Sequence, residues 1–387
     1  MKGILIYPLY RRLEPGPGKD PEGFLDKGTV LEITRLIPGD EMEGINLWFQ
    51  ADDGFFYWSG GINMLVDNDT VAWQTLDEKT KMAVLSSIVN DEANQLMRKA
   101  IGLLGYGMGY KNDNEIAGLA LTVFVDNKTP SENLEKEISY KGVHGIPVDI
   151  KPVTKIEHQQ YIPGGIRQLR PDDSVPMQMG GSVSVADSQD YGSRGLVLVD
   201  KQDKRYLLTC FHVLLNDFKS KKTFPFPESR PIMATYPGAT NTTTNDRKTQ
   251  PVVSGIYSPK YDFALVSLTD NGDFLNAFDN RRFRGIHTSD TIPSLLGKQV
   301  SMAGASSSLQ QGKVLDTKVT IFVGPTQAQF DNVIAVEKIS IAGDSGAPVI
   351  DQDNKVVGII IAGDPDGRSY VLPVFRIIFQ QGYNLLK

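Results

Sequence analysis

The chain has 387 residues, of which 40% are hydrophobic and 22% are charged, and its formal net charge is −6. This composition is that of a globular protein with a sizeable core, and it excludes a chain that is disordered along most of its length. The acidic balance argues against binding to nucleic acid or to an anionic membrane through a broad basic face.

One cysteine, Cys210, is present, so no intramolecular disulfide can form. A single cysteine favours a reducing compartment. The first residues lack the apolar core of a secretory signal, and no stretch has the length of a transmembrane helix. We therefore predict a cytoplasmic protein that does not engage a membrane.

Residues 1–66 contain short β-like runs, GILIY, KGTVLEI, INLWFQ and FFYWSG, separated by glycine and proline turns. This pattern predicts a small β-barrel. The order of YRRLEPGPG, LDKGTVLEI, LWFQ and ADDGFFYWSGGI resembles that of a bacterial SH3-like domain. The aromatic side chains of Trp48, Phe49, Phe55, Phe56, Tyr57 and Trp58 exceed what a small barrel needs inside. They either pack against another part of the chain or bind an extended or proline-rich peptide.

Residues 67–155 change character and predict a small α+β module. An amphipathic helix is expected over 75–101, where Met82, Leu85, Val89, Leu96 and Ala100 share one face. Strand-like runs follow at LLGYGMGYK, LALTVFVDNK and IPVDIKPV. This layout resembles the region that precedes the protease domain in a family of bacterial trypsin-like proteins.

Residues 165–387 read as many short strands at near-regular spacing, which predicts an all-β barrel or sandwich. Within them, the stretch IAGDSGAPVI holds Ser345 between Gly343-Asp344 and Gly346. Such a serine either lies in a tight turn or is a catalytic nucleophile, beside which glycines let backbone N–H groups approach a reacting carbonyl.

A serine nucleophile needs a base, which is usually histidine. His212 ends an apolar strand in LLTCFHVLL, and Asp262 opens another in KYDFALVSL, where a buried carboxylate could orient the imidazole. The candidate order is His212, Asp262, Ser345. The other histidines are His144, His158 and His287; none has partners at metal-ligand spacing, so they are interpreted as surface or core residues.

The stretches TCFHV, YDFALV and GDSGAPV together resemble the three signature stretches of chymotrypsin-fold serine proteases, in that family's order. The resemblance implies a mainly β fold with a double β-barrel. It also implies that Ser345 attacks the scissile carbonyl, that His212 moves the proton and that Asp262 orients the ring. The N–H groups of Gly343 and Ser345 would form the oxyanion hole, with Asp344 as an anchor behind them. This chemistry requires no metal and no organic cofactor.

The same resemblance suggests where substrate binds. Ile361, Ala362 and Gly363, at the end of GIIIAG, would line the substrate groove. Ile339 would lie at the base of the primary pocket. Because that position is apolar, we expect cleavage after a small or apolar residue rather than after Lys or Arg. No cleavage site stands at the barrel start, so activation by a freed amine that pairs with Asp344 is not expected.

The sequence therefore predicts an intracellular serine endopeptidase that acts on proteins or peptides through an acyl-enzyme. An SH3-like barrel (1–66) and an α+β module (67–155) would precede the protease domain (165–387), regulate it or recruit substrate, and receive a regulatory protein partner. The alternative is a catalytically silent protease-fold scaffold, or a peptide-binding protein that acts through the SH3-like domain.

Overall fold

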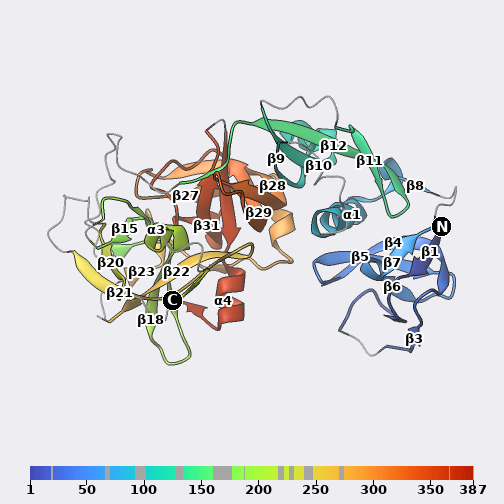
Figure 1. Ribbon diagram of the computed structural model, residues 1–387, viewed down its shortest axis with the longest axis horizontal. Coiled ribbons are helices and arrows are strands. Elements are labelled where there is room, and N and C mark those ends of the chain that lie inside the picture. The colour runs from blue at the N-terminus through green and yellow to red at the C-terminus, as the bar shows by residue number, and fades with distance from the viewer. Residues whose placement is uncertain are drawn as a thin grey trace. The chain divides into compact units, whose positions relative to one another are not determined.

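The structure is a computed structural model that divides into two compact units, residues 1–152 and 153–387 (Figure 1). It describes residues 1–18, 21–65, 70–91, 102–127, 134–159, 177–186, 188–216, 222–225, 231–238, 247–269, 274–365 and 367–386. The division predicted between residues 66 and 67 stays a prediction. No helix in these described ranges is both long enough and apolar enough to cross a membrane.

The first unit begins with a five-stranded antiparallel sheet in the order β6-β5-β4-β1-β7. Its strands are β1 (Lys2–Leu5), β4 (Val30–Met42), β5 (Ile45–Ala51), β6 (Phe56–Trp58) and β7 (Ile62–Met64). In the chain, β1 is followed by β2 (Leu9–Tyr10) and β3 (Phe24–Leu25), which pair antiparallel with each other before β4 begins. A 3-10 turn, η1 (Ser59–Gly61), joins β6 to β7. Leu47, Trp48, Phe49 and Tyr57 are fully buried and form its core.

Helix α1 (Glu78–Asn90) follows in the same unit. It begins there because the Asp77 side chain accepts a hydrogen bond from the Thr80 N–H at 2.9 Å, which satisfies a free donor of the first turn. The helix that the sequence predicts, over residues 75–101, is longer than this. Two of its expected apolar positions, Leu96 and Ala100, lie outside the described residues. Leu85 and Val89 are buried as expected, while Met82 is half-buried.

The remaining elements of this unit are β8 (Val71–Ala72), η2 (Trp73–Thr75), β9 (Leu103–Tyr110), η3 (Lys111–Asp113), η4 (Glu115–Ala117), β10 (Leu119–Asp126), β11 (Glu137–Tyr140) and β12 (Val143–Val153). Strands β11, β12, β10 and β9 are neighbours in that order. Seven of the eight residues of β10 are buried, since the run LALTVFV is apolar apart from one threonine. The module is therefore mixed α and β, as the sequence predicts.

The second unit contains a first antiparallel sheet in the order β16-β15-β20-β21-β22-β18-β17-β33, with β19 beside β21. The bounds are β15 (Ser182–Val185), β16 (Gly192–Ser193), β17 (Leu196–Val199), β18 (Arg205–Thr209), β19 (Thr223–Phe224), β20 (Met233–Tyr236), β21 (Lys248–Ser258), β22 (Tyr261–Leu268) and β33 (Asn384–Leu385). Thr209 at the end of β18 faces Ala264 near the start of β22. This register brings the segment after β18 close to Asp262.

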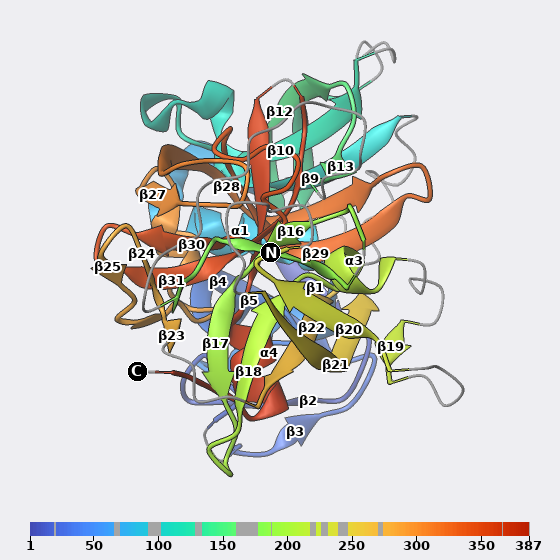
Figure 2. The same cartoon turned by 90° about the vertical axis from the view of Figure 1, so that its left-hand side faces the viewer.

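A second set of six strands closes on itself, because β28 pairs with β27 at one edge and with β29 at the other. Its order is β28-β27-β30-β31-β32-β29, with bounds β27 (Gln299–Met302), β28 (Gln310–Val323), β29 (Ala328–Glu337), β30 (Pro348–Asp351), β31 (Lys355–Gly363) and β32 (Arg368–Pro373). Its interior includes Val300, Met302, Ile334, Val349 and Ile360. Figure 2 shows these orange and red strands beside the green and yellow strands of the first sheet.

The shorter elements of this unit are β13 (Glu157–His158), β14 (Met177–Gln178), β23 (Phe274–Leu275), β24 (Ala277–Phe278), β25 (Arg281–Arg282), β26 (Gly285–Ile286), η7 (Ile292–Leu295), α3 (Phe211–Leu214) and α4 (Phe375–Gln381). Two of them matter for the site. The one-turn helix α3 carries His212, and β13 pairs with the last residues of β31.

Candidate active site

His212 lies in α3, directly after the buried strand β18, and its side chain is fully buried. Its Nδ1 is 2.6 Å from Oδ2 of Asp262, the second residue of β22. The other carboxylate oxygen, Oδ1, accepts the backbone N–H of His212 at 3.1 Å. The carboxylate therefore fixes both the ring and the backbone of the histidine.

Ser345 lies in the turn before β30, and its Oγ is 2.8 Å from Nε2 of His212. Because Nδ1 faces a carboxylate, the hydrogen-bond pattern assigns the ring proton to Nδ1 and leaves Nε2 to accept the serine hydroxyl proton. The structure thus brings the predicted residues His212, Asp262 and Ser345 into one continuous line of hydrogen bonds.

The electrostatics of this line favour an ionised aspartate. Burial by itself raises the pKa of Asp262, but the charge of His212 and two hydrogen bonds from it act in the opposite direction and lower the pKa below its ordinary value. Cys210 differs, since burial raises the pKa of its thiol and Sγ donates to the Ile360 carbonyl at 3.3 Å. A protonated, enclosed thiol behaves as a small hydrophobic group.

Gly343 adopts φ +102°, in the left-handed region that favours glycine. A Cβ there would collide with the Ser306 hydroxyl and the Tyr191 ring. In this conformation the Gly343 N–H donates to the Gln159 carbonyl oxygen at 2.5 Å. The Ser345 N–H donates to the same oxygen at 3.4 Å. Two backbone donors beside the serine thus converge on one carbonyl oxygen.

Asp344, between these two donors, is fully buried and is held by the loop at 305–307. Its Oδ1 accepts the N–H groups of Ser306 and Ser307, and its Oδ2 accepts the Ser307 hydroxyl at 2.6 Å and the Ile341 N–H at 2.9 Å. Burial raises the pKa of Asp344 despite these bonds. Four donors from the chain itself satisfy this carboxylate, so it needs no freed amine.

Ser193, which the sequence analysis does not single out, ties the same loop to the first sheet. Its buried hydroxyl donates to the Gly343 carbonyl at 3.0 Å and accepts the Ala305 N–H at 2.8 Å. Its backbone N–H donates to the Ser345 carbonyl at 2.7 Å. Ser193 therefore holds the carbonyls of Gly343 and Ser345, the two residues whose N–H groups converge on Gln159. No local motif marks it, because its partners are far away in the sequence.

A segment of the chain runs along the predicted substrate strand. Glu157 and His158 form β13, antiparallel to the end of β31, with Glu157 opposite Gly363 and His158 opposite Ala362. The His158 Nδ1 is 3.0 Å from the Ile361 carbonyl oxygen. The predicted groove residues Ile361, Ala362 and Gly363 thus meet residues of the chain's own segment.

The imidazole of His158 stacks on that of His212, with ring centroids 3.9 Å apart and an interplanar angle of 26°. Its Nε2 is 3.1 Å from the Tyr257 hydroxyl. The sequence interpretation of His158 as a surface or core residue without such partners is therefore wrong, because its ring lies beside His212 and Asp262. The sequence holds no signal for this role, since the ring is brought to the site by backbone pairing of β13.

Gln159 is buried, with 8% of the residue exposed, and its side chain lies against Gly363 at the end of β31. Its Nε2 donates to the Ser340 carbonyl at 3.4 Å, and a Cβ at Gly363 would collide with the carboxamide. Ile339, the predicted pocket base, belongs to the buried core of the second barrel. The described polar partner of Gln159 is therefore a backbone carbonyl next to Ile339.

The ligand atoms of His158, His212 and Asp262 lie within 4.8 Å of one another, which is close enough for a metal site. The ring nitrogens are already engaged, however, with Asp262, Ser345, Ile361 and Tyr257. The arrangement supports proton transfer better than metal coordination. Of the other histidines, His144 is exposed, and His287 is buried.

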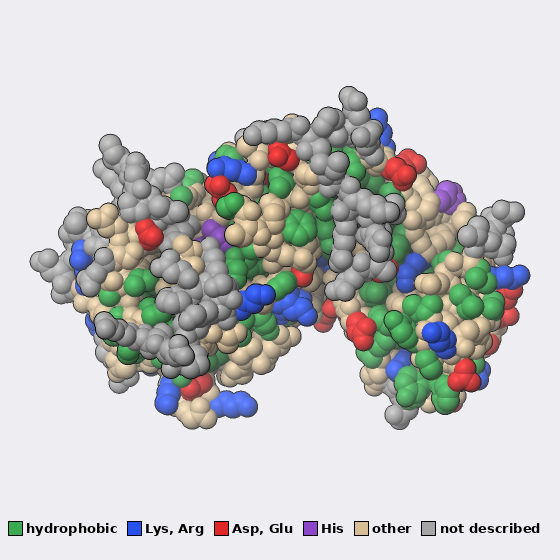
Figure 3. Space-filling model, viewed as in Figure 1, with side chains coloured by type: hydrophobic (Ala, Val, Ile, Leu, Met, Phe, Trp, Pro, Cys, Tyr) green, Lys and Arg blue, Asp and Glu red, His purple; other side chains and the backbone are tan. Residues whose placement is uncertain are grey.

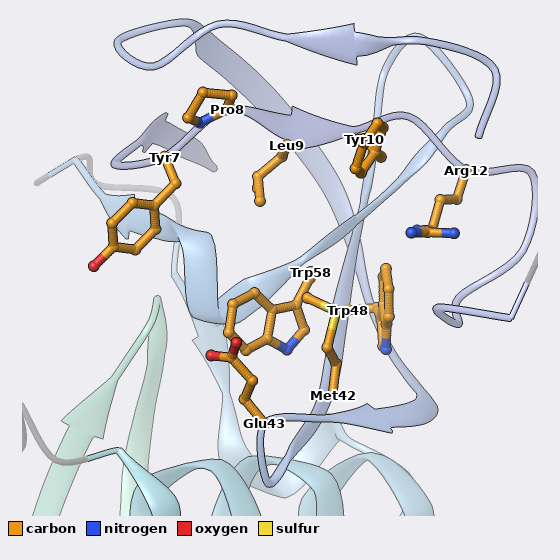
Figure 4. A pocket seen from close by; sticks show the side chains of 9 residues that line it. All are labelled: Tyr7, Pro8, Leu9, Tyr10, Arg12, Met42, Glu43, Trp48 and Trp58. Atoms are coloured by element: carbon orange, nitrogen blue, oxygen red, sulfur yellow. The ribbon is translucent and has the colours of Figure 1, made fainter. Parts of the chain in front are cut away.

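A separate pocket of about 470 Å³ lies in the first unit. Its lining includes Tyr7, Tyr10, Trp48 and Trp58, and Figure 4 shows the two tyrosines and the two tryptophans around one hollow. The tyrosines are 59% and 54% exposed, whereas Trp48 is fully buried. Figure 3 shows hydrophobic side chains gathered over this unit, interspersed with charges of both signs.

Residues 194–359 match the Trypsin-like peptidase domain family. The chain is also similar to Protease A of Thermobifida fusca, with 16% identity over 54% of this chain and 97% of that chain and a TM-score of 0.40. A protease of Nocardiopsis has 15% identity over 54% of this chain and 98% of its own, again with a TM-score of 0.40. No curated protein is similar enough in sequence to match the chain.

The family match covers His212, Asp262 and Ser345, the residues that the hydrogen bonds connect. Together with the observed strand order, it confirms the prediction of a mainly β chain with a chymotrypsin-like double barrel. Residues 194–359 are therefore similar to a trypsin-like peptidase domain.

Proposed function

We propose that this protein is a serine endopeptidase that hydrolyses peptide bonds through an acyl-enzyme. The observation that carries the proposal is the line from Asp262 through His212 to Ser345, next to two N–H groups that converge on one carbonyl oxygen. A nucleophile, a base, an orienting carboxylate and an oxyanion site are the parts that acyl transfer needs.

The reaction proceeds in two halves. Ser345 Oγ attacks the scissile carbonyl while His212 Nε2 takes the hydroxyl proton, and Asp262 stabilises the imidazolium. The N–H groups of Gly343 and Ser345 bind the oxyanion, a contribution of about 10²–10³-fold per donor. His212 returns the proton to the leaving amine, and water then releases the acyl group by the same steps in reverse.

A catalytically silent scaffold is less well supported. Such a protein has no physical need for an aspartate buried against a histidine, since burying a charge costs free energy unless a function or a partner compensates for it. Here Asp262 is fully buried, and among the described residues its carboxylate is hydrogen-bonded by the backbone and the ring of His212. Intact geometry therefore favours the enzyme.

The test is hydrolysis of a mixture of unfolded protein substrates. Because residues 157–159 fill the groove, we would compare the wild-type chain with a double variant, His158→Gly/Gln159→Gly, called the groove-cleared variant. We expect hydrolysis by the groove-cleared variant and a loss of roughly 10⁴–10⁶-fold on adding Ser345→Ala. Equal hydrolysis with and without Ser345→Ala would refute the proposal.

We also propose that residues 1–66 form an SH3-like domain that binds an extended peptide of a regulatory protein. Support comes from the strand order β6-β5-β4-β1-β7, from the 3-10 turn between β6 and β7, and from the aromatic pocket of Figure 4. Exposed tyrosines above buried tryptophans suit an apolar peptide. Binding of a proline-rich peptide that is weakened by Tyr10→Ala would support this role, and binding unaffected by that substitution would oppose it.

We further propose that the protein works in the cytoplasm and that its N-terminal modules regulate the protease. The single buried Cys210 suits a reducing compartment. Regulation is suggested by the groove segment 157–159, which lies shortly after the first unit in the chain. A peptide that binds the SH3-like domain should change the rate of hydrolysis; an unchanged rate at saturating peptide would count against this coupling.

A further inference from the structure

Residues 157–159 occupy the site in the manner of the acyl side of a substrate. Glu157 and His158 extend β31 by antiparallel pairing, which is how a peptide adds a strand to a sheet edge. The next residue, Gln159, donates from its side chain to the Ser340 carbonyl and accepts at its own carbonyl oxygen from two backbone N–H groups. Backbone, side chain and carbonyl are thus all engaged at once.

The position of the Gln159 carbonyl oxygen carries the argument. It accepts hydrogen bonds from the Gly343 N–H at 2.5 Å and the Ser345 N–H at 3.4 Å. A carbonyl held by the N–H of Ser345 itself presents its carbon to the hydroxyl of that residue, and this hydroxyl is 2.8 Å from the base His212. A segment that only covered the groove would have no reason to place a peptide carbonyl there.

The histidine preceding it strengthens this reading. The His158 ring stacks on His212 at 3.9 Å and is fixed by the Ile361 carbonyl and the Tyr257 hydroxyl. These contacts exclude water from one face of the His212 ring and hold the segment in register. If β13 paired with β31 one residue out of register, the ring stacking of His158, the contact of the Gln159 side chain with Ser340 and the contacts of the Gln159 carbonyl oxygen would all be lost.

We propose that the chain is its own substrate and that it cleaves the peptide bond that follows Gln159. This inference rests on the proposed serine endopeptidase function and names a substrate for it. Ser345 Oγ forms an ester with the Gln159 carbonyl carbon as the C–N bond breaks, and His212 gives the hydroxyl proton to the leaving amine. Water then hydrolyses the ester, which frees the Gln159 carboxylate and restores the serine.

The surroundings of the Gln159 side chain also define which residue is preferred on the acyl side of the bond. The Gln159 carboxamide donates to the Ser340 carbonyl, and Gly363 leaves room for it. The nearby carboxylate of Asp364 is already used by the Gly367 N–H and the Tyr370 hydroxyl. A lysine could donate to the Ser340 carbonyl, but it would bury its positive charge beside a neutral acceptor. The preference is thus for a neutral residue with the length of glutamine, where the sequence predicted a small or apolar one.

The test follows the full-length chain after purification by intact mass spectrometry. Wild type should separate into fragments 1–159 and 160–387, and Ser345→Ala should remain intact. Gln159→Lys should slow the separation by at least about 100-fold, because a neutral carbonyl does not compensate for the burial of a positive charge. Gln159→Met, which is neutral and of similar length, should retain it within about 10-fold.

Lys155→Gln serves as the matched control. Lys155 precedes β13, is 55% exposed in its side chain and contacts Glu157 at 2.9 Å. It should cleave at the wild-type rate, because exposed ion pairs contribute little. A Gln159→Lys chain that is cleaved at the same bond as fast as the Lys155→Gln chain would overturn the role of the Gln159 side chain and the proposal.

Treatment of the groove-cleared variant with a fluorophosphonate, which labels an activated serine, distinguishes failure of the self-cleavage proposal from failure of the protease proposal. If Ser345 is labelled there but wild type stays intact or is cut at another bond, self-cleavage after Gln159 is wrong and the protease function stands. If wild type stays intact and Ser345 is not labelled, both proposals fall.

Discussion

Ser193→Ala tests whether the loop before Ser345 is positioned from the first sheet. The substitution removes one hydroxyl and leaves the Gly343 carbonyl and the Ala305 N–H without their partner, although both are bonded to Ser193 at 3.0 and 2.8 Å in the wild type. A buried polar group without a partner costs about 1–3 kcal/mol. The free energy of unfolding should therefore fall by about 2–6 kcal/mol.

The catalytic effect is separate from this cost. When its carbonyl loses this hydrogen bond, the Gly343–Asp344 peptide can rotate. This peptide lies between the two residues whose N–H groups face the substrate oxygen, so its rotation changes the direction of one N–H relative to the other. Removing one such donor costs about 10²–10³-fold, so partial misalignment should lower kcat by about 10–10²-fold with a smaller effect on KM. The assay is peptide hydrolysis in the groove-cleared variant, beside denaturant unfolding of the same chains.

Ser301→Ala is the matched control for Ser193→Ala. Ser301 is also a buried serine of the second unit, and its hydroxyl accepts Arg281 Nη1 at 2.8 Å, away from the loop at 343–345. It should lose stability without losing kcat. If the two variants have equal kcat, Ser193 is only structural and the positioning argument is refuted.

The remaining predictions concern Asp262 and Cys210. Asp262→Asn should lower kcat by about 10⁴-fold in a peptide-hydrolysis assay, because an amide cannot hold the ring proton on Nδ1 of His212; a loss below tenfold would contradict that role. The folded-state pKa of Asp262 is lowered from 3.8, so its stabilisation is present above that pH and is lost as the pH falls through the lowered value. The difference in unfolding free energy between wild type and Asp262→Asn should thus be constant near neutrality and shrink below pH 3.8. A difference that grows on acidification would mean that folding raises the pKa of Asp262 instead of lowering it. Cys210→Ala should keep hydrolysis within about threefold, because the enclosed, protonated thiol is no nucleophile, and a complete loss measured in the same assay would argue otherwise.

The sequence predicts the parts of this protein that depend on local pattern. Short apolar runs separated by turns predict the strands of both barrels, and the stretches around His212, Asp262 and Ser345 predict which side chains meet. Those three segments are rigid strand ends, so their position follows from the fold. Asp77 likewise limits helix α1 to a start at Glu78, which the periodic apolar face alone did not define.

The features missed by the sequence analysis depend on contacts between distant segments. Ser193 and Gly343 are 150 residues apart in the chain. His158 and Gln159 lie between the predicted domains, and their place is set by main-chain pairing with β31, which depends little on side-chain identity. Ile339 precedes Ser345 by a fixed number of residues, and that spacing gives its position in the chain but not the direction of its side chain.

The most direct test of the central claim is fluorophosphonate labelling of the groove-cleared variant, with the adduct located by peptide mass spectrometry. The account predicts one adduct, on Ser345, whose rate of formation falls by roughly 10⁴-fold or more on adding His212→Ala. An adduct on another residue, or a Ser345 adduct that forms equally fast without His212, would contradict it.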